Sequence, residues 1–309
     1  DIIVISDQMQ ESTNEALRQL PVRLLIADYT DSSKAKAMSL AMNATADIPY
    51  DAVVIMDADN TAGTSFLSEL NPVFQSGARA VQAHRTAKNT NTDIAVLDAA
   101  SEEINNSIFR SGHIALGLSS ALIGSGMALE ACWFRQHIHL LETAGEDKEM
   151  EALLLKQRIH IEYLEHVYVK DEKTQKKEGI KNQRKRWIAA QFDSLVRTLP
   201  DFPKELLRGN IDCCDKVFQW TLLPRIILIF CTFFFTILVT LVSPYSSIKW
   251  WILAFALFLA LFTAIPGHLL NKQLLRAIFQ LPSLLLGIAS NLFKLKGVNK
   301  KFIHTEHGN

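Results

Sequence analysis

Two aspartates directly follow an apolar run in the first quarter of the sequence. Ala52–Met56 has the composition of a buried strand, and Asp57-Ala58-Asp59 comes immediately after it. Carboxylates at positions i and i+2 suit a hard divalent cation such as Mg²⁺ or Mn²⁺, whose remaining coordination sites can take diphosphate oxygens. The same pattern is also typical of solvated turns and caps that bind nothing. Taken alone, the pair leaves both interpretations open.

A further carboxylate and a lysine precede this pair. Asp7 ends the apolar run at the N-terminus, and Lys34 lies near the start of a predicted helix. The positive end of a helix dipole favours an anion at such a position. Each residue alone is equally typical of a polar turn or an exposed helix start. Only together with Asp57 and Asp59 do they indicate a site for a phosphorylated ligand.

Acidic residues also open a helical stretch in the middle of the chain. Glu146 and Asp147 follow Ala144-Gly145 and lead into the segment KEMEAL. An aspartate at a helix start is ordinarily a cap for the backbone N–H groups. It can equally serve as a general base when an acceptor hydroxyl comes within hydrogen-bond reach.

The densest group of functional side chains is Gln183-Arg184-Lys185-Arg186-Trp187. Three cations beside a tryptophan can form a patch for anionic lipid next to a membrane. Arginine can also bind a diphosphate through two hydrogen bonds, and an indole offers a flat apolar surface to a sugar ring. Transfer of a sugar from a nucleotide diphosphate requires both of these functions.

The elements that would position these residues alternate between strand and helix patterns. Apolar runs of strand type cover Ile2–Ser6, Arg23–Ala27 and Ala52–Met56, and helical patterns cover Ser33–Thr45 and Ser101–Arg110. Strands separated by helices predict an α/β fold with a largely parallel sheet. Ligands bind at the carboxyl ends of strands in such sheets, which is where Asp7, Asp57 and Asp59 lie.

Composition excludes several classes of protein. The chain has 32 Lys and Arg against 32 Asp and Glu in 309 residues, so a strong basic field for nucleic acid is absent. The four cysteines show neither metal-binding spacing nor a disulfide pattern, which fits a reducing cytosolic environment. The sequence starts without Met and directly in an apolar run, so we expect an N-terminally truncated fragment.

Two uncharged runs follow the balanced first part. Residues 226–242 and 250–267 each have about the 17 to 20 residues that a helix needs to cross the hydrocarbon core of a bilayer. They predict a transmembrane helical hairpin, although two buried core helices are the alternative. The basic segment beyond it, residues 269–309, is predicted to be an interfacial amphipathic helix on the cytosolic face, because a further crossing would oppose the positive-inside tendency.

In their order along the chain, these motifs resemble the family 2 membrane glycosyltransferases, which include cellulose, hyaluronan and poly-N-acetylglucosamine synthases. The matching residues are Asp7, Lys34-Ala35, Asp57-Ala58-Asp59, Glu146-Asp147 and the QRKRW segment, ahead of the hairpin. Gly124-Ser125-Gly126-Met127-Ala128 resembles the small-residue acceptor loop of that family, and Gln82 lies where the strand after the Asp-x-Asp motif is expected.

The resemblance implies a fold and roles for these residues. It implies a type A glycosyltransferase (GT-A) domain over residues 1–215 whose first strand is missing, the hairpin over 216–268 with spans near 225–242 and 250–267, and the basic region over 269–309. Asp147 would be the catalytic base. The other implied residues are Asp7, Lys34, Asp57, Asp59 and Arg186 for the nucleotide sugar, Asp57 and Asp59 for Mg²⁺ or Mn²⁺, and Gln183, Trp187, Glu146 and Gly126 for the acceptor.

The implied enzyme inverts the anomeric centre and uses a nucleotide-diphosphate sugar, expected to be a UDP-sugar. Its acceptor would be a growing glycan or a lipid at the cytosolic face of the plasma (inner) membrane, with membrane lipids and no nucleic acid as partners. Gly145 stands where the family commonly has threonine, and Ser6-Asp7-Gln8 replaces a frequent Asp-Asp-Gly. The alternatives are a ceramide-type lipid glycosyltransferase that adds one sugar, a non-catalytic membrane protein, and a transporter, for which two crossings are few.

Overall fold

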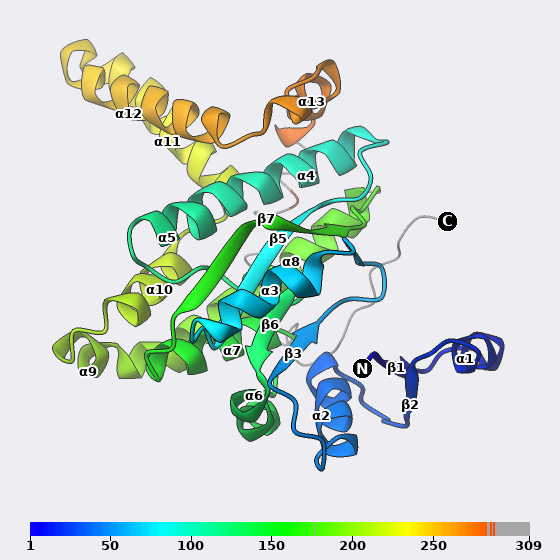
Figure 1. The fold of residues 1–309 in the computed structure, drawn as a ribbon. Helices are drawn as coiled ribbons and strands as arrows, with labels where there is room; N and C mark the ends of the chain where they lie inside the picture. The colour runs from blue at the N-terminus through cyan, green and yellow to red at the C-terminus, as the bar shows by residue number, and fades with distance from the viewer. Residues whose placement is uncertain (176, 283–284, 286, 288–309) are drawn as a thin grey trace.

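The computed structural model describes residues 1–175, 177–282, 285 and 287 (Figure 1). The strands are β1 (Ile3–Asp7), β2 (Arg23–Ala27), β3 (Ala52–Ile55), β4 (Thr61–Ala62), β5 (Ala80–Ala87), β6 (Met127–Glu130) and β7 (Ile161–Asp171). The first helices are α1 (Glu11–Arg18), α2 (Lys34–Ala44), α3 (Phe66–Gln75), α4 (Asp93–Asn106), α5 (Gly112–Ala115), α6 (Ala131–His137) and α7 (Glu146–Lys156). The later ones are α8 (Lys177–Thr198), α9 (Phe202–Leu207), α10 (Ile211–Thr221), α11 (Arg225–Val242), α12 (Pro244–Thr263) and α13 (Lys272–Ile278).

The strands form two separate sheets, so the mixed α/β class is confirmed but the largely parallel sheet is wrong. β1 and β2 form a parallel pair of their own. The main sheet has the order β3-β6-β5-β7-β4, and in it only β5 and β7 run parallel. β6 lies antiparallel between β3 and β5, because the chain crosses the sheet once more after α5. The sequence contains no local signal for the direction in which a four-residue strand enters a sheet.

Both faces of the main sheet are covered, and each face has its own apolar core. On one face, Phe66 and Leu70 of α3 pack on Val81, Val167 and Val169. On the other face, helices α2, α6 and α7 pack on the alternate strand residues. That second core contains Met38, Phe134, Met150 and Leu154 together with Ala80, Met127, Leu129 and Ile161. Alternation of successive side chains between the two faces is what allows neighbouring residues of one strand to serve different cores.

The start of α2 agrees closely with the sequence prediction. α2 begins after Ser33, whose hydroxyl accepts the N–H of Lys36, as expected for the predicted helix Ser33–Thr45. The predicted helix Ser101–Arg110 is too short and starts too late. In the structure α4 begins at Asp93 after the cap Thr92 and continues through a π-helical turn, Ser107–Ser111.

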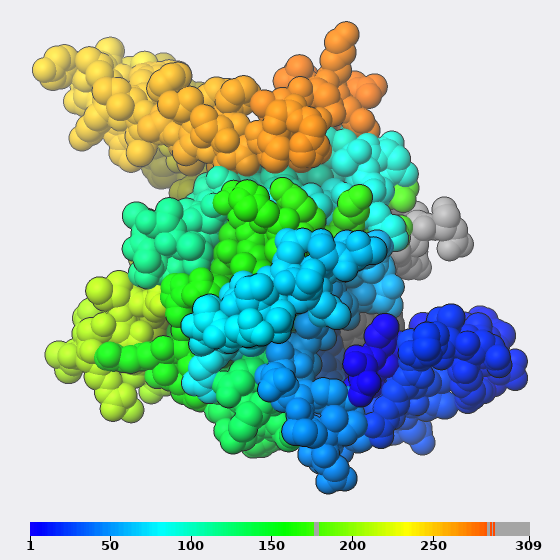
Figure 2. All heavy atoms as spheres, in the orientation of Figure 1, coloured from blue at the N-terminus to red at the C-terminus, as the bar shows by residue number. Residues whose placement is uncertain are grey.

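α11 and α12 are long and apolar enough to cross a membrane by length and composition, and little of either is buried inside the protein. α11 has the predicted bounds, 225–242, and α12 packs against it. The second helix begins at Pro244 rather than residue 250, because proline fits the first position of a helix and the serines after it continue the turn. It ends at Thr263, ahead of Pro266. Figure 2 shows these helices with α13 as a layer over α4.

α13 joins this layer to the body of the protein. Leu274 and Ala277 of α13 lie in one apolar cluster with Val96 and Ala100 of α4 and Ile226 of α11. Of the predicted amphipathic region, residues 269–309, only 269–282, 285 and 287 are described, so most of that prediction lies outside the described residues.

Candidate functional site

The Lys34 side chain brings three distant segments together. Its ammonium group forms an ion pair with Asp57, which follows β3. It also donates to the carbonyl oxygen of Gly124 at 2.7 Å and lies 3.9 Å from a carboxylate oxygen of Glu146. Lys34 is held at this point because it is the first residue of α2, directly after the capping Ser33. A single cation therefore connects α2, the Asp57 turn, the Gly124 loop and the start of α7.

Glu146 and Asp147 face this cation from the first turn of α7. A side-chain Cβ built on Gly124 would lie 3.8 Å from the Glu146 carboxylate and 3.9 Å from the Asp147 Cβ, so the loop passes closely over both residues. Burial, reinforced by the neighbouring Asp147 charge and only partly offset by Lys34, raises the pKa of Glu146 to about 7. The pair thus combines a carboxyl group that holds its proton near neutral pH with a partly exposed Asp147.

The close approach of α8 to α7 depends on Gly145. A Cβ at this position would lie 2.5 Å from the Cβ of Ala190, a separation that packed carbons do not reach. Gly145 is the position where threonine was expected from the family resemblance. In this chain the missing side chain is what lets α8 lie against the start of α7.

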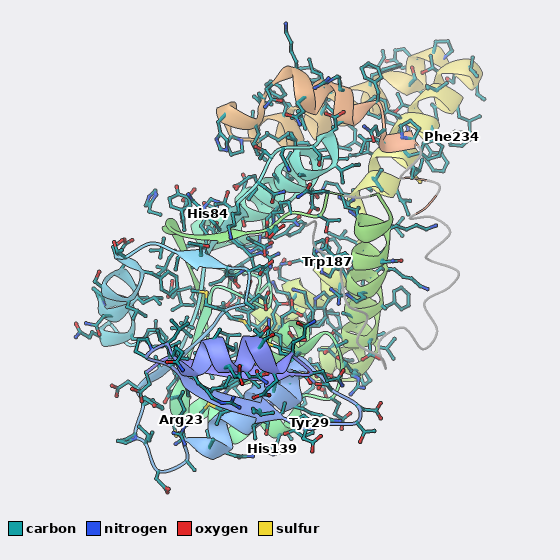
Figure 3. The ribbon with its side chains drawn as sticks, turned by 90° about the vertical axis from the view of Figure 1, so that its right-hand side faces the viewer. Arg23, Tyr29, His84, His139, Trp187 and Phe234 are labelled. Carbon is teal, nitrogen blue, oxygen red and sulfur yellow. The ribbon has the colours of Figure 1, made fainter. Side chains whose placement is uncertain are left out.

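Arg186 is the part of the QRKRW segment that acts on the same acidic residues. Burial lowers the pKa of Arg186, while the charges of Glu146 and Asp57 act in the opposite direction. Gln183 has a buried amide oxygen with no hydrogen-bond partner among the described residues. Trp187, on α8, is 44% exposed (Figure 3). An exposed ring next to an arginine provides a flat surface on which a sugar can stack.

Asp59 belongs to a tight polar turn with Asn60. The Asn60 amide donates to Asp59 at 3.1 Å and to Asp171, the last residue of β7, at 3.2 Å. The Asn60 side-chain oxygen also accepts the N–H of Asp57 at 3.2 Å. Both aspartates of the motif are therefore oriented by one asparagine. Neither Asn60 nor Asp171 was predicted as a site residue. Asn60 could have been considered because it directly follows Asp59.

Asp7 lies beside the start of α2 and outside the Lys34 contacts. One oxygen of its carboxylate accepts a hydrogen bond from Ser32, and the other is buried with no hydrogen-bond partner among the described residues. A buried carboxylate oxygen without a donor is costly unless a ligand supplies one. The β1–β2 pair that carries Asp7 stands apart from the main sheet (Figure 1).

Gly126 has a different position from Gly124. Its φ is +62°, and a Cβ there would lie 3.1 Å from the Val169 side chain, so it packs against the sheet. Gln82, fully buried, donates to the carbonyl oxygens of Ser125 and Gly126 and accepts the N–H of Ile123. Gln82 and Gly126 thus hold the loop against the sheet. Gly124 is the glycine that lies next to the charged residues.

The chemistry of the donor atoms fits a magnesium or manganese ion shared with a substrate. Among the described residues, no group of three or more His, Cys, Asp or Glu side chains is arranged to hold a metal. Asp57 and Asp59 supply two hard carboxylates, and Mg²⁺ is commonly held by one or two carboxylates together with substrate phosphates. Asp57 is paired with Lys34 in this structure, so a divalent cation would supply the counter-charge for Asp57 and a diphosphate would supply the counter-charge for Lys34.

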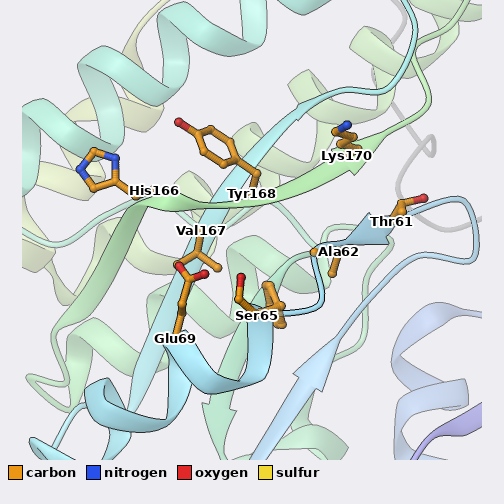
Figure 4. A pocket seen from close by; sticks show the side chains of 10 residues that line it. Thr61, Ala62, Ser65, Glu69, His166, Val167, Tyr168 and Lys170 are labelled. Carbon is orange, nitrogen blue, oxygen red and sulfur yellow. The ribbon is translucent and has the colours of Figure 1, made fainter.

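One pocket of the protein lies elsewhere. It has a volume of about 230 Å³ and is formed by β4, the start of α3 and the outer edge of β7 (Figure 4). Glu69, His166 and Lys170 contribute its charged or titratable lining. None of the residues predicted for the site lines it.

The comparison with protein families identifies the class. The model described as glycosyl transferase family group 2 matches residues 52–263, from the first residue of β3 to the last of α12. This is more than half of the chain, so the protein belongs to this glycosyltransferase family. Asp7 and Lys34 precede the matched region.

The other comparisons add little. A solved structure titled "Crystal Structure of a Mycobacterial Protein" is 14% identical, with a TM-score of 0.43. The match covers 63% of this chain and 64% of that chain, so this chain spans less than two thirds of its length. No curated protein sequence matches the chain.

Proposed function

We propose that the protein transfers a sugar, with inversion, from a nucleotide diphosphate such as a UDP-sugar to a growing glycan or a lipid. The observation that carries this proposal is the convergence of Lys34, Asp57, Gly124 and Glu146-Asp147. Two cations, Lys34 and Arg186, act on a group of carboxylates, and such mixed charge suits a metal-bound diphosphate beside a proton acceptor.

In this mechanism Asp147 is the catalytic base. The acceptor hydroxyl gives its proton to the Asp147 carboxylate while its oxygen forms a bond to the anomeric carbon. The bond from that carbon to the diphosphate oxygen breaks, and the nucleoside diphosphate leaves with the electron pair. Lys34 and Arg186 stabilise the charge on the leaving group.

Asp57 and Asp59 would hold the divalent cation. When bound, such a cation neutralises charge on the diphosphate as a Lewis acid. Lys34, which pairs with Asp57 in this structure, would then be available to bind a phosphate oxygen. Asp7, with its partnerless buried oxygen, would accept a hydrogen bond from the nucleoside.

The acceptor side is assigned to the residues around Trp187. Trp187 and Gln183 on α8, together with Glu146 and the loop containing Gly126, would bind the acceptor sugar. α8 leads through α9 and α10 to the apolar helices α11 and α12. We therefore place the site at the cytosolic face of the plasma (inner) membrane, with the two helices spanning it and lipids around them.

The test is release of nucleoside diphosphate by the purified membrane protein, given a panel of nucleotide sugars with Mg²⁺ or Mn²⁺ and a lipid or glycan acceptor. Asp147→Asn should preserve donor binding and lower turnover at least about 100-fold, the scale of a lost general base. Asp193→Asn, on α8 in an ion pair with Arg197, is the control and should keep turnover.

Near-normal turnover of Asp147→Asn would contradict the assignment of the base. Product analysis separates the two acceptor classes, because a single sugar on a lipid indicates the ceramide-type reaction and a polymer indicates a synthase. No release from any donor would instead favour a non-catalytic membrane protein.

A further inference from the structure

Four charged side chains form a buried group behind the candidate site, which we call the Arg85 cluster. It consists of Arg85 on β5, Glu102 on α4, and Asp171 and Lys173 at the end of β7. Arg85 donates to Glu102 at 2.7 Å, and Lys173 forms ion pairs with Glu102 and, at 2.8 Å, with Asp171. Burial would raise the pKa of Glu102, but Arg85 and Lys173 outweigh it and hold that pKa at about 2. The cluster therefore has two cations and two anions.

One side of the cluster leads to the Asp57–Asn60 turn. The Arg85 guanidinium lies 3.7 Å from Asp171, and Asp171 accepts the amide of Asn60. The same amide donates to Asp59. Two residues, Asp171 and Asn60, thus connect the buried guanidinium to a carboxylate assigned to the metal.

The other side of the cluster leads to the Gly124 loop. Another nitrogen of the Arg85 guanidinium donates to the Ser125 hydroxyl at 3.3 Å and to the carbonyl oxygen of Ile123 at 3.4 Å. The residue between them, Gly124, accepts from Lys34. One nitrogen of the planar guanidinium thus contacts the Gly124 loop, and another lies near Asp171, which in turn binds the Asp57–Asn60 turn.

We propose that Arg85 is a positioning residue that fixes the Asp57–Asn60 turn and the Gly124 loop relative to each other, and so sets the geometry in which Asp59 meets the metal and the diphosphate. This inference rests on the proposed function. A lysine cannot replace Arg85, because a single ammonium group lacks the fixed fork that reaches Glu102, Ser125 and Asp171 in different directions. Partners that orient metal ligands commonly change metal affinity about 10- to 100-fold when they are lost.

The test compares Arg85→Lys with Arg79→Lys in the full chain. Arg79 directly precedes β5 and pairs with Glu130 on the surface, outside the cluster, so it is a matched control. Binding of UDP is measured by calorimetry with and without Mn²⁺, and the thermal unfolding midpoint is recorded for each variant. We expect Arg85→Lys to keep metal-free UDP binding and to weaken the Mn²⁺-supported binding about 10- to 100-fold, with Arg79→Lys unchanged.

Two further variants test the two sides of the Arg85 cluster separately. They also keep the inference testable if Arg85→Lys does not fold. Asp171→Asn should weaken Mn²⁺-supported UDP binding. Ser125→Ala should leave that binding intact and lower turnover, because only the loop contact is lost.

Unchanged Mn²⁺ dependence in folded Arg85→Lys, or in Asp171→Asn if Arg85→Lys shows no unfolding transition, would overturn the inference. An equal loss of UDP binding with and without Mn²⁺ would also overturn it, since that indicates general damage. If the wild-type chain itself shows no Mn²⁺-enhanced UDP binding, the proposed function fails, which is a distinct result.

Discussion

At the scale of single residues, the site is defined by charges that lie closer together than their sequence positions suggest. Lys34 and Gly124 are 90 positions apart and share a hydrogen bond, and Lys34 also reaches Asp57 and Glu146. Glu146 is unfavourably placed for a charged carboxylate, because it is buried next to Asp147. The free energy of unfolding therefore depends on whether the Glu146 carboxyl is protonated.

This link gives a pH prediction. The folded-state pKa of Glu146 is about 7 and the unfolded value is near 4.5, so the folded chain keeps this proton longer. The resulting stabilisation is present below pH 4.5 and is lost as the pH rises to 7, by on the order of 3 kcal/mol at most. The thermal unfolding midpoint of the wild-type protein should fall between pH 4.5 and pH 7. Glu146→Gln should remove the part of this decrease that comes from Glu146.

The matched control is Glu142→Gln, at an exposed carboxylate before α7. It should retain the wild-type pH profile of the thermal midpoint. Identical profiles for Glu146→Gln and the wild-type protein would show that Glu146 ionises normally.

At the scale of secondary-structure elements, the contact between α7 and α8 decides whether Glu146 and Arg186 lie close enough for their charges to interact. The contact is close only because Gly145 has no side chain above Ala190. The backbone of Gly145, with φ of −113°, is open to other residues, so the constraint is steric and comes from α8.

Gly145→Ala should therefore destabilise the fold by about 1 to 3 kcal/mol through overpacking, measured as a lower thermal midpoint. Gly63→Ala is the control, because its added Cβ would meet nothing nearer than 4.0 Å. The double variant Gly145→Ala with Ala190→Gly should recover part of the loss, since the two positions share one contact. If the losses of stability from the two single variants simply add in the double variant, the destabilisation does not arise from the contact between residues 145 and 190.

At the scale of the whole molecule, the surface formed by α11 and α12 is more apolar than the rest. α11 and α12 expose phenylalanine, leucine and isoleucine side chains along most of their length, Phe234 among them (Figure 3). Between the two helices, Thr236 is fully buried, Trp251 donates to Thr240, and the ring centroids of Phe235 and Trp250 lie 6.4 Å apart. An apolar exterior around such a contact is the arrangement that lipid favours.

The full chain should therefore remain in the membrane fraction after extraction at alkaline pH, because exposure of these helices to water is unfavourable over their whole length. The measurement is the distribution of the protein between pellet and supernatant, with a peripheral protein as the control. Release into the supernatant would contradict the membrane-spanning role of α11 and α12.

Much of this could be predicted from the sequence because the signals are local. An apolar run ending in Asp57-Ala58-Asp59, the serine that caps α2, and the uncharged stretch that becomes α11 each depend on neighbouring residues alone. The order of the motifs, and with it the class of enzyme, follows from such segments, and the family match supports the class.

Only the tertiary structure decided how those segments meet. The antiparallel entry of β6, the separation of β1 and β2 from the main sheet, and the choice of Gly124 over Gly126 as the glycine near Lys34 all depend on packing between distant segments. The same holds for Arg85, which is an ordinary strand residue in the sequence and becomes the centre of a buried charge cluster. The physical reason is that burial and pairing energies arise between surfaces that come together only in the folded chain.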